Sequence, residues 1–177
     1  MDNSDHRIWR YRILLLAAFF LFSGAGRGIC QTSKQTAKAY AAWSGGTLIP
    51  SGRTEIDGRL MTCGSAPTVL DPQLGDFGES YSGFIVLNPK LFVGLATPVK
   101  LWIYSHECAH QTVGPDEAKA DCVAVERGRR EGWLNAAGLA QVCAFMKPAN
   151  ADSVHFSGPR RCELMKRCFV QGTLSPS

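Results

Sequence analysis

The pattern His-Glu-x-x-His at residues 106–110 restricts the fold of this 177-residue chain more than any other feature. On an α-helix, residues four apart project from one face about one turn apart, so His106 and His110 can reach a single metal ion. Glu107 points about 100° round the helix from His106. Its carboxylate can therefore meet a water beside the metal without taking a coordination position.

Two imidazoles and a nearby carboxylate are the side chains that hydrolytic zinc chemistry needs. Zinc lowers the pKa of a coordinated water to about 7, and a carboxylate can take its proton as the water attacks a carbonyl group. We therefore predict Zn²⁺ as the cofactor, His106 and His110 as metal ligands, and Glu107 as the general base.

The residues around this pattern predict a helix. Thr97 suits the N-cap and Pro98 the first helical position. Small or apolar residues then recur at helical spacing. They are Leu101, Trp102, Ser105, Cys108, Ala109 and Thr112.

A catalytic zinc site takes three protein ligands, so a third ligand must follow His110. Glycine and proline after the helix that carries His106 and His110, called the metal helix below, predict a tight turn. Residues 116–132 then predict a further helix folded back on the metal helix. Glu117, in its first turn, is the preferred third ligand. Asp116 is the alternative, either as the ligand or as a simple N-cap. Asp121, one turn further on, can hydrogen-bond a ligating histidine and fix its tautomer.

The pattern at 106–110, followed by Glu-x-x-Ala-Asp at 117–121, resembles the gluzincin zinc metallopeptidases. It is most similar to the group that includes the CAAX prenyl endopeptidases and the bacterial heat-shock membrane proteases, and among these to small exported minimal gluzincins. The resemblance covers residues 102–164 and implies a zincin-like fold with Glu117 as the third zinc ligand.

The same group carries a late His-Pro segment with an arginine six residues after the histidine, near the substrate carbonyl. His155 and Arg161 match this segment, while Phe156 stands in place of the proline. The resemblance therefore implies that His155 and Arg161 stabilise the oxyanion.

The N-terminus predicts an export signal over residues 1–25. Three arginines precede an apolar run at 13–22, and the small residues at 23–25 suit a cleavage site. The run is shorter than the roughly 20 residues of a membrane span. We expect its removal, no stable membrane span afterwards, a single domain over 26–177 and a secreted or periplasmic location. An uncleaved membrane anchor is the alternative.

Seven cysteines in an exported chain favour disulfides. A Cys108–Cys122 bridge would join the two metal-bearing helices, and a Cys162–Cys168 bridge would close a short loop. The connectivity stays open at this point, and the odd count leaves one thiol over.

The segment between the first predicted helix, at 32–43, and the metal helix has strand-like pieces separated by turn residues. These pieces are residues 47–49, 59–62, 69–70 and 83–87. The pattern predicts an α+β fold in which a small sheet is packed on one side by the metal helix and the helix after it. Residues 84–87 form either an edge strand beside the cleft, able to pair with a peptide, or a buried core strand.

Further helices are expected over 135–145 and 159–169. Their apolar residues are most simply core residues. These are Leu134, Leu139, Val142, Phe145 and Leu164.

The net charge of +4 is spread along the chain, and only the arginines at 127, 129 and 130 are close together. Such a cluster suits the last turn of a helix, so no nucleic-acid partner is expected.

The predicted function is zinc-dependent hydrolysis of a peptide or protein substrate outside the cytoplasm. The alternative is a non-catalytic, disulfide-stapled secreted module that binds a partner and whose metal site or polar cluster is structural.

Overall fold

The computed structural model describes residues 35–171, which form an α+β fold. A four-stranded mixed sheet has the order β1-β4-β6-β5, with β4 and β6 parallel and the other two pairings antiparallel. A separate two-stranded hairpin follows β1 in the chain. The strands are β1 (Thr47–Ile49), β2 (Thr54–Ile56), β3 (Arg59–Met61), β4 (Thr68–Leu70), β5 (Gly78–Tyr81) and β6 (Phe84–Leu87). The predicted export signal and Cys30 lie outside the described residues.

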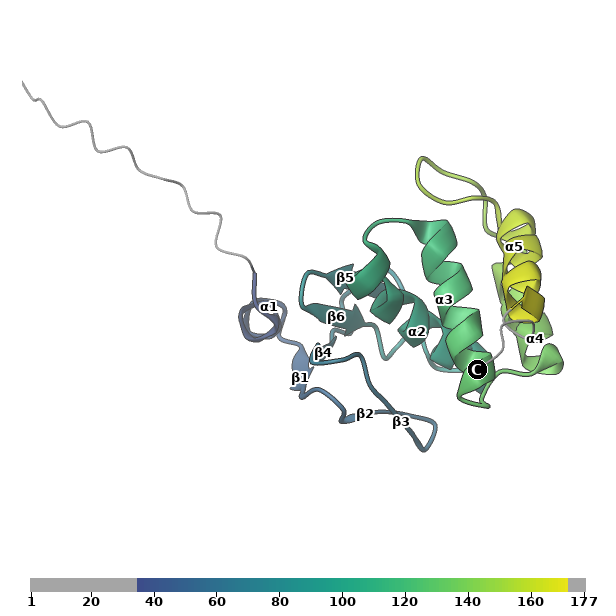
Figure 1. Ribbon diagram of the computed structural model, residues 1–177. Coiled ribbons are helices and arrows are strands. Elements are labelled where there is room, and N and C mark those ends of the chain that lie inside the picture. Colours follow the sequence, from purple (N-terminus) through teal and green to yellow (C-terminus); the bar gives the residue numbers. More distant parts are fainter. Residues whose placement is uncertain (1–34, 172–177) are drawn as a thin grey trace, which may run out of the picture. The chain divides into compact units, whose positions relative to one another are not determined.

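Five helices accompany the strands in this part of the chain, and α3 stands between α2 and α5 (Figure 1). They are α1 (Ala37–Ser44), α2 (Thr97–Val113), α3 (Glu117–Arg130), α4 (Ala136–Met146) and α5 (Gly158–Gln171). None of the described helices is long and apolar enough to cross a bilayer.

Strand β6 is buried along its whole length because helices cover both faces of the sheet. Successive side chains of a strand point to opposite faces. Phe84 and Val86 accordingly pack with Tyr40 of α1, while Ile85 and Leu87 pack in the cluster that contains α2. The interpretation of 84–87 as an edge strand is therefore wrong, and the core-strand alternative is confirmed. The edge strands of this sheet are β1 and β5.

Helix α2 begins one residue earlier than expected. Its N-cap is Ala96, so Thr97 is already helical, and the Thr97 hydroxyl donates to Asp57 Oδ2 at 2.6 Å. Pro98 still lies in the first turn, where its missing N–H leaves no hydrogen bond unmade. The helix ends at Gly114, whose φ of 67° suits glycine and whose N–H donates to the His110 carbonyl.

The sequence predicts that α3 packs on the sheet, but α3 packs chiefly against α2 and α5. Its N-cap is Asp116, whose Oδ1 accepts from the Lys119 amide at 3.0 Å. Ala120 and Ala124 are fully buried, and small residues on that stripe let two helix backbones approach closely. Helix α3 is therefore held in place by other helices, and α1 covers the sheet face for which the sequence predicts no helix.

Three disulfides connect these elements, and neither expected bridge forms. Cys63 pairs with Cys108, Cys122 with Cys168, and Cys143 with Cys162, with Cα–Cα separations of 5.1 to 5.5 Å. At about 100° per residue, Cys108 lies some 200° round α2 from His106, and Cys122 some 140° round α3 from Glu117. Cysteines that point away from the metal site on both helices cannot meet across it. Three disulfides indicate an oxidising, extracytoplasmic environment.

Peptide mapping under non-reducing conditions tests this connectivity and should recover the three pairs above, with no peptide joining Cys108 to Cys122. Replacing both Cys122 and Cys168 by serine opens a link across 46 residues. We expect a loss of about 4 kcal/mol in the free energy of unfolding, against about 3 kcal/mol for the pair 19 residues apart, Cys143 and Cys162. Urea unfolding of both double variants measures the difference, and an unchanged midpoint contradicts the assignment.

Candidate metal centre

Two consecutive helices bring His106, His110 and Glu117 to one point. Their ligand atoms all lie within 4.8 Å of one another. Among the described residues, this is the group of histidine, cysteine and carboxylate side chains that is compact enough to hold one metal ion. The histidines share one face of α2, and Glu117 comes from the first turn of α3 after the tight connection at Gly114. The turn is short enough to fold α3 back along α2, which places the carboxylate opposite both imidazoles.

The distances within this triad match the edges of a zinc coordination polyhedron. His106 Nε2 lies 3.0 Å from Glu117 Oε2 and 3.1 Å from His110 Nε2, and His110 Nε2 lies 3.5 Å from Glu117 Oε1. A tetrahedral ion with ligand distances of about 2.0 to 2.1 Å holds its ligand atoms roughly 3.3 Å apart. The three side chains therefore fit a small divalent cation with little rearrangement.

Both imidazoles turn Nε2 toward the triad because Nδ1 has a partner elsewhere. His110 Nδ1 lies 2.6 Å from the Gly114 carbonyl oxygen, an acceptor to which it can only donate. His106 Nδ1 makes a short, bent contact of 3.0 Å with Asp121 Oδ1. A proton on Nδ1 leaves the Nε2 lone pair available for a metal.

Asp121 lies one turn after Glu117, is fully buried and joins the centre to α5. Arg161 donates to both oxygens of its carboxylate, from Nε to Oδ2 and from Nη2 to Oδ1, each at 2.7 Å. This two-point pair neutralises a charge that burial would otherwise make costly. Asp121 therefore lies 3.0 Å from a predicted ligand, His106, and Arg161 reaches the centre through Asp121.

The charges of the centre shift the titration of its members. Burial lowers the pKa of His106, but Asp121 and Glu117 outweigh it and raise that pKa to about 9. Burial raises the pKa of Glu117, but hydrogen bonds to His106 and His110 bring it far below its usual range. Burial also raises the pKa of Asp121, and Arg161 and His106 together lower it on balance. Without a metal, the carboxylates are thus anions beside a protonated imidazole.

Glu107 lines the same cleft as the triad and lies beneath strand β5. A Cβ placed on Gly78 would approach Glu107 Cγ to 2.7 Å, so only glycine allows the strand to pass this close. Burial raises the pKa of Glu107, and His106 and His110 partly offset the increase. A carboxylate with a raised pKa is better suited to accept a proton near neutral pH.

His155 reaches the centre from the loop between α4 and α5. Its Nε2 lies 3.1 Å from Glu117 Oε2, and its Nδ1 lies 2.9 Å from Asp152 Oδ2. Asp152 also accepts from the amides of Val154 and His155, which fixes the loop locally. His155 contacts a predicted ligand but does not belong to the group whose ligand atoms all converge.

A cleft of about 1180 Å³ opens over the triad. Strand β5 lines it, the helix residues Glu107 and His110 form part of its wall, and the His155 loop lies in the lining as well. Apolar side chains are also present, including Phe77 and Phe145, whose rings make an edge contact at 5.1 Å. Leu134, Leu139 and Val142 are buried as expected, whereas Phe145 is only half-buried because it faces this cleft.

Some residues of the site were not predicted from the sequence. The group that could hold a metal contains Glu117, whereas Asp116 caps α3 and pairs with exposed Lys119. Asp152 was missed, although an aspartate three residues before a histidine is a local hydrogen-bonding pattern. Gly78 was missed too, because β5 is short and polar and gives no strand signal.

Comparison with known proteins found no match to a family model, to a curated protein or to a solved structure.

Changing Glu117 to glutamine should weaken zinc binding far more than changing Asp116 to asparagine. Altering a side chain that only supports a metal ligand costs about 10- to 100-fold in metal affinity, so loss of a ligand should exceed about 100-fold. Asparagine at 116 can still cap α3, which makes this variant a matched control. Competition with a chromogenic zinc chelator gives both affinities, and equal losses contradict the assignment of Glu117.

Zinc binding should release a proton near neutral pH. In the metal-free protein the pKa of His106 is about 9, so the imidazole carries a proton that zinc must displace. The affinity should therefore rise as the pH increases from about 6.5 to 9 and level off above that. Titration calorimetry in buffers of different ionisation enthalpy counts the protons released, and an affinity independent of pH contradicts the raised pKa.

Proposed function

We propose that this protein is a zinc-dependent peptidase that hydrolyses extended peptides outside the cytoplasm. The observation that carries the proposal is the convergence of His106, His110 and Glu117 beside an acidic side chain that is not needed as a ligand, Glu107, in an open cleft. A purely structural metal site has no use for a carboxylate in that place.

Zinc bound by the triad supplies a Lewis acid that lowers the pKa of water and polarises a carbonyl group. In the proposed reaction, Glu107 accepts the proton of the attacking water and passes it to the leaving amine. Its raised pKa and its place on the metal helix support both steps. His106 and His110 would hold the metal through their Nε2 atoms, which the partners of Nδ1 keep turned toward the triad.

The roles of His155 and Arg161 are proposed on their contacts. His155 lies in the cleft lining and can donate to the oxygen that gains charge during the attack, which is the expected oxyanion role. Both hydrogen bonds of Arg161 described above go to Asp121. We therefore assign Arg161 an indirect role, in which it holds Asp121 against His106.

Strand β5 is the proposed docking edge for the peptide. Asn88 N donates to Phe77 O at 3.0 Å, and hydrogen-bonded pairs recur at every second residue of an antiparallel ladder. Glu79 and Tyr81 therefore bond to β6, and the backbone groups of Gly78 and Ser80 point away from it. An extended peptide can pair with such an edge, which brings its backbone alongside Glu107.

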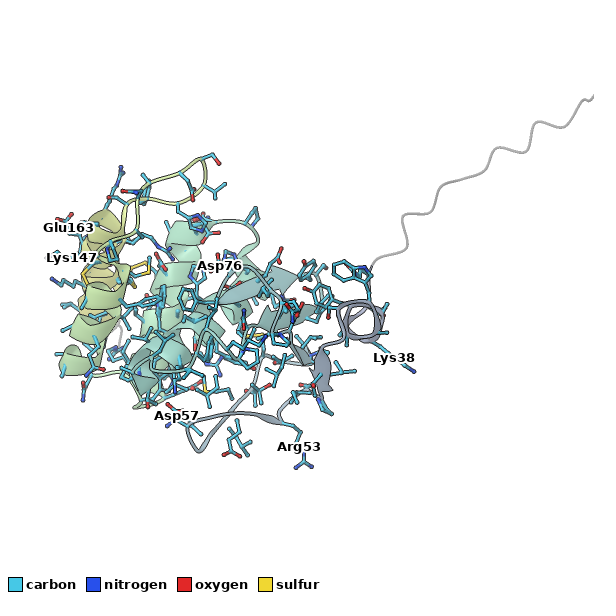
Figure 2. All side chains as sticks on the ribbon, turned by 180° about the vertical axis from the view of Figure 1, so that it is seen from behind. Lys38, Arg53, Asp57, Asp76, Lys147 and Glu163 are labelled. Atoms are coloured by element: carbon cyan, nitrogen blue, oxygen red, sulfur yellow. A yellow bond between two sulfur atoms is a disulfide. The ribbon has the colours of Figure 1, made fainter. Side chains whose placement is uncertain are left out.

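Changing Glu107 to glutamine should abolish hydrolysis and leave zinc bound, because the amide keeps the shape of the side chain but cannot accept the proton. The zinc-loaded protein is incubated with a mixture of unstructured peptides, and new termini are identified by mass spectrometry. Changing Glu163 to glutamine is the control, since this exposed residue projects from the outer side of α5 (Figure 2).

Normal turnover by the Glu107 variant would refute the role of Glu107. The rival function, a secreted binding module with a structural metal, predicts that the wild-type protein cleaves no peptide although it binds zinc. It also predicts four protein ligands in the X-ray absorption spectrum of the zinc-loaded protein, whereas a peptidase needs three and an open position.

A further inference from the structure

We propose that Gln111 is a positioning residue that fixes the distance between the edge strand β5 and the side chain of Glu107. The inference rests on the proposed function and adds to it a residue whose described side-chain hydrogen bonds go neither to a proposed metal ligand nor, in this proposal, to the substrate. Gln111 directly follows His110 on α2 and is half-buried. Its side chain belongs to the metal helix, yet all its hydrogen bonds described below go to the β5–β6 hairpin.

The Gln111 amide binds the hairpin at both sides of its turn. Oε1 accepts from the Gly83 amide at 2.9 Å. Nε2 donates to Ser80 Oγ at 2.6 Å and to the Tyr81 carbonyl at 2.8 Å, with the Phe84 carbonyl at 3.3 Å. Gly83 has a φ of 93°, a conformation that favours glycine, so the turn itself is shaped to present these groups. One side chain therefore fixes the end of the strand to the helix.

The two contacting residues of α2 are spaced about as far apart as the two residues of β5 that they contact. Glu107 and Gln111 are four residues apart on α2 and lie on one face, about 6 Å apart along the axis. Gly78 and Ser80 are two residues apart on β5 and share a face, about 6.8 Å apart. Glu107 packs beneath Gly78, and Gln111 hydrogen-bonds Ser80. The strand thus rests on two points, one formed by the proposed base and the other by Gln111.

These two points decide where a bound peptide would lie. The contact at Gly78 is close packing without a hydrogen bond, so it limits the approach of the strand but does not hold it. The hydrogen bonds of Gln111 supply the attachment. Without them, pairing with β6 is the only hydrogen bonding described that holds β5, and the distance between its outward backbone groups and Glu107 is no longer fixed. The effect should fall on substrates long enough to pair with β5.

The test compares Gln111→Met with wild type on two substrates. One is an extended peptide that the wild-type protein cleaves, and the other is the same scissile bond shortened to an N-acyl dipeptide amide. Methionine keeps the length of the side chain and removes its hydrogen bonds. We expect KM for the long peptide to rise about tenfold, with kcat and the short substrate changed less than about twofold and with zinc content unchanged. Gln141→Met, the same change at an exposed position of α4, is the matched control.

Hydrogen exchange supplies a readout that needs no catalysis. The hydrogen-bonded amides of Glu79, Tyr81 and Gly83 should exchange faster in the zinc-loaded Gln111→Met variant than in wild type, while those of α2 stay protected. Unchanged exchange in this segment, or an equal loss of activity on long and short substrates, overturns the inference. If the wild-type protein cleaves no peptide at all, the proposed function fails, and the exchange result still decides whether Gln111 holds the strand. If the methionine variant does not fold, Gln111→Glu removes the Nε2 donor and keeps the acceptor for Gly83.

Discussion

The buried carboxylate of Asp121 ties the candidate centre to the rest of the fold. It lies on α3, accepts two hydrogen bonds from Arg161 of α5 and contacts His106 of α2. A charge with no exposure to water is costly unless it is paired, so three helices must keep their relative positions for it to remain so. The same interaction orients the imidazole that a metal would bind. The Asp121 carboxylate thus contributes both to the stability of the fold and to the geometry of the site.

Disulfides reinforce this arrangement from the outside. Cys122–Cys168 joins α3 to α5 on the side of α3 away from the triad, and Cys143–Cys162 joins α4 to α5. Cys63–Cys108 anchors the metal helix to the segment after β3. Covalent links therefore hold the scaffold, and all six described cysteines are in disulfides, so none of them is available as a metal ligand. The loop that carries His155 lies between two helices joined in this way, which keeps its ends together.

Much of the candidate site could be predicted because its signals are local. Helical periodicity alone places His106 and His110 on one face, and a tight turn at Gly114 makes a ligand from the next helix geometrically reasonable. Other parts could not be predicted. Strand β5 has the sequence Gly-Glu-Ser-Tyr, without an apolar alternation, and it forms because β6 and Gln111 supply its partners. For this reason the sequence pattern offers residues 84–87 as an edge strand, with a core strand as the alternative, and gives no sign of β5.

Residue spacing alone predicts the helix that carries residues 106–110, the helix after it and the possible donor atoms on both, because side-chain positions within a helix follow from its repeat. The pairing of the cysteines, the strand that borders the cleft and the partner of Arg161 follow instead from tertiary packing. These depend on side chains 19 to 46 residues apart, from the Cys143–Cys162 bridge, through the Gln111 contact with Ser80 and the Arg161 contact with Asp121, to the Cys122–Cys168 bridge. Contacts of that range are set by how helices and strands pack, and no local pattern of residues records that packing.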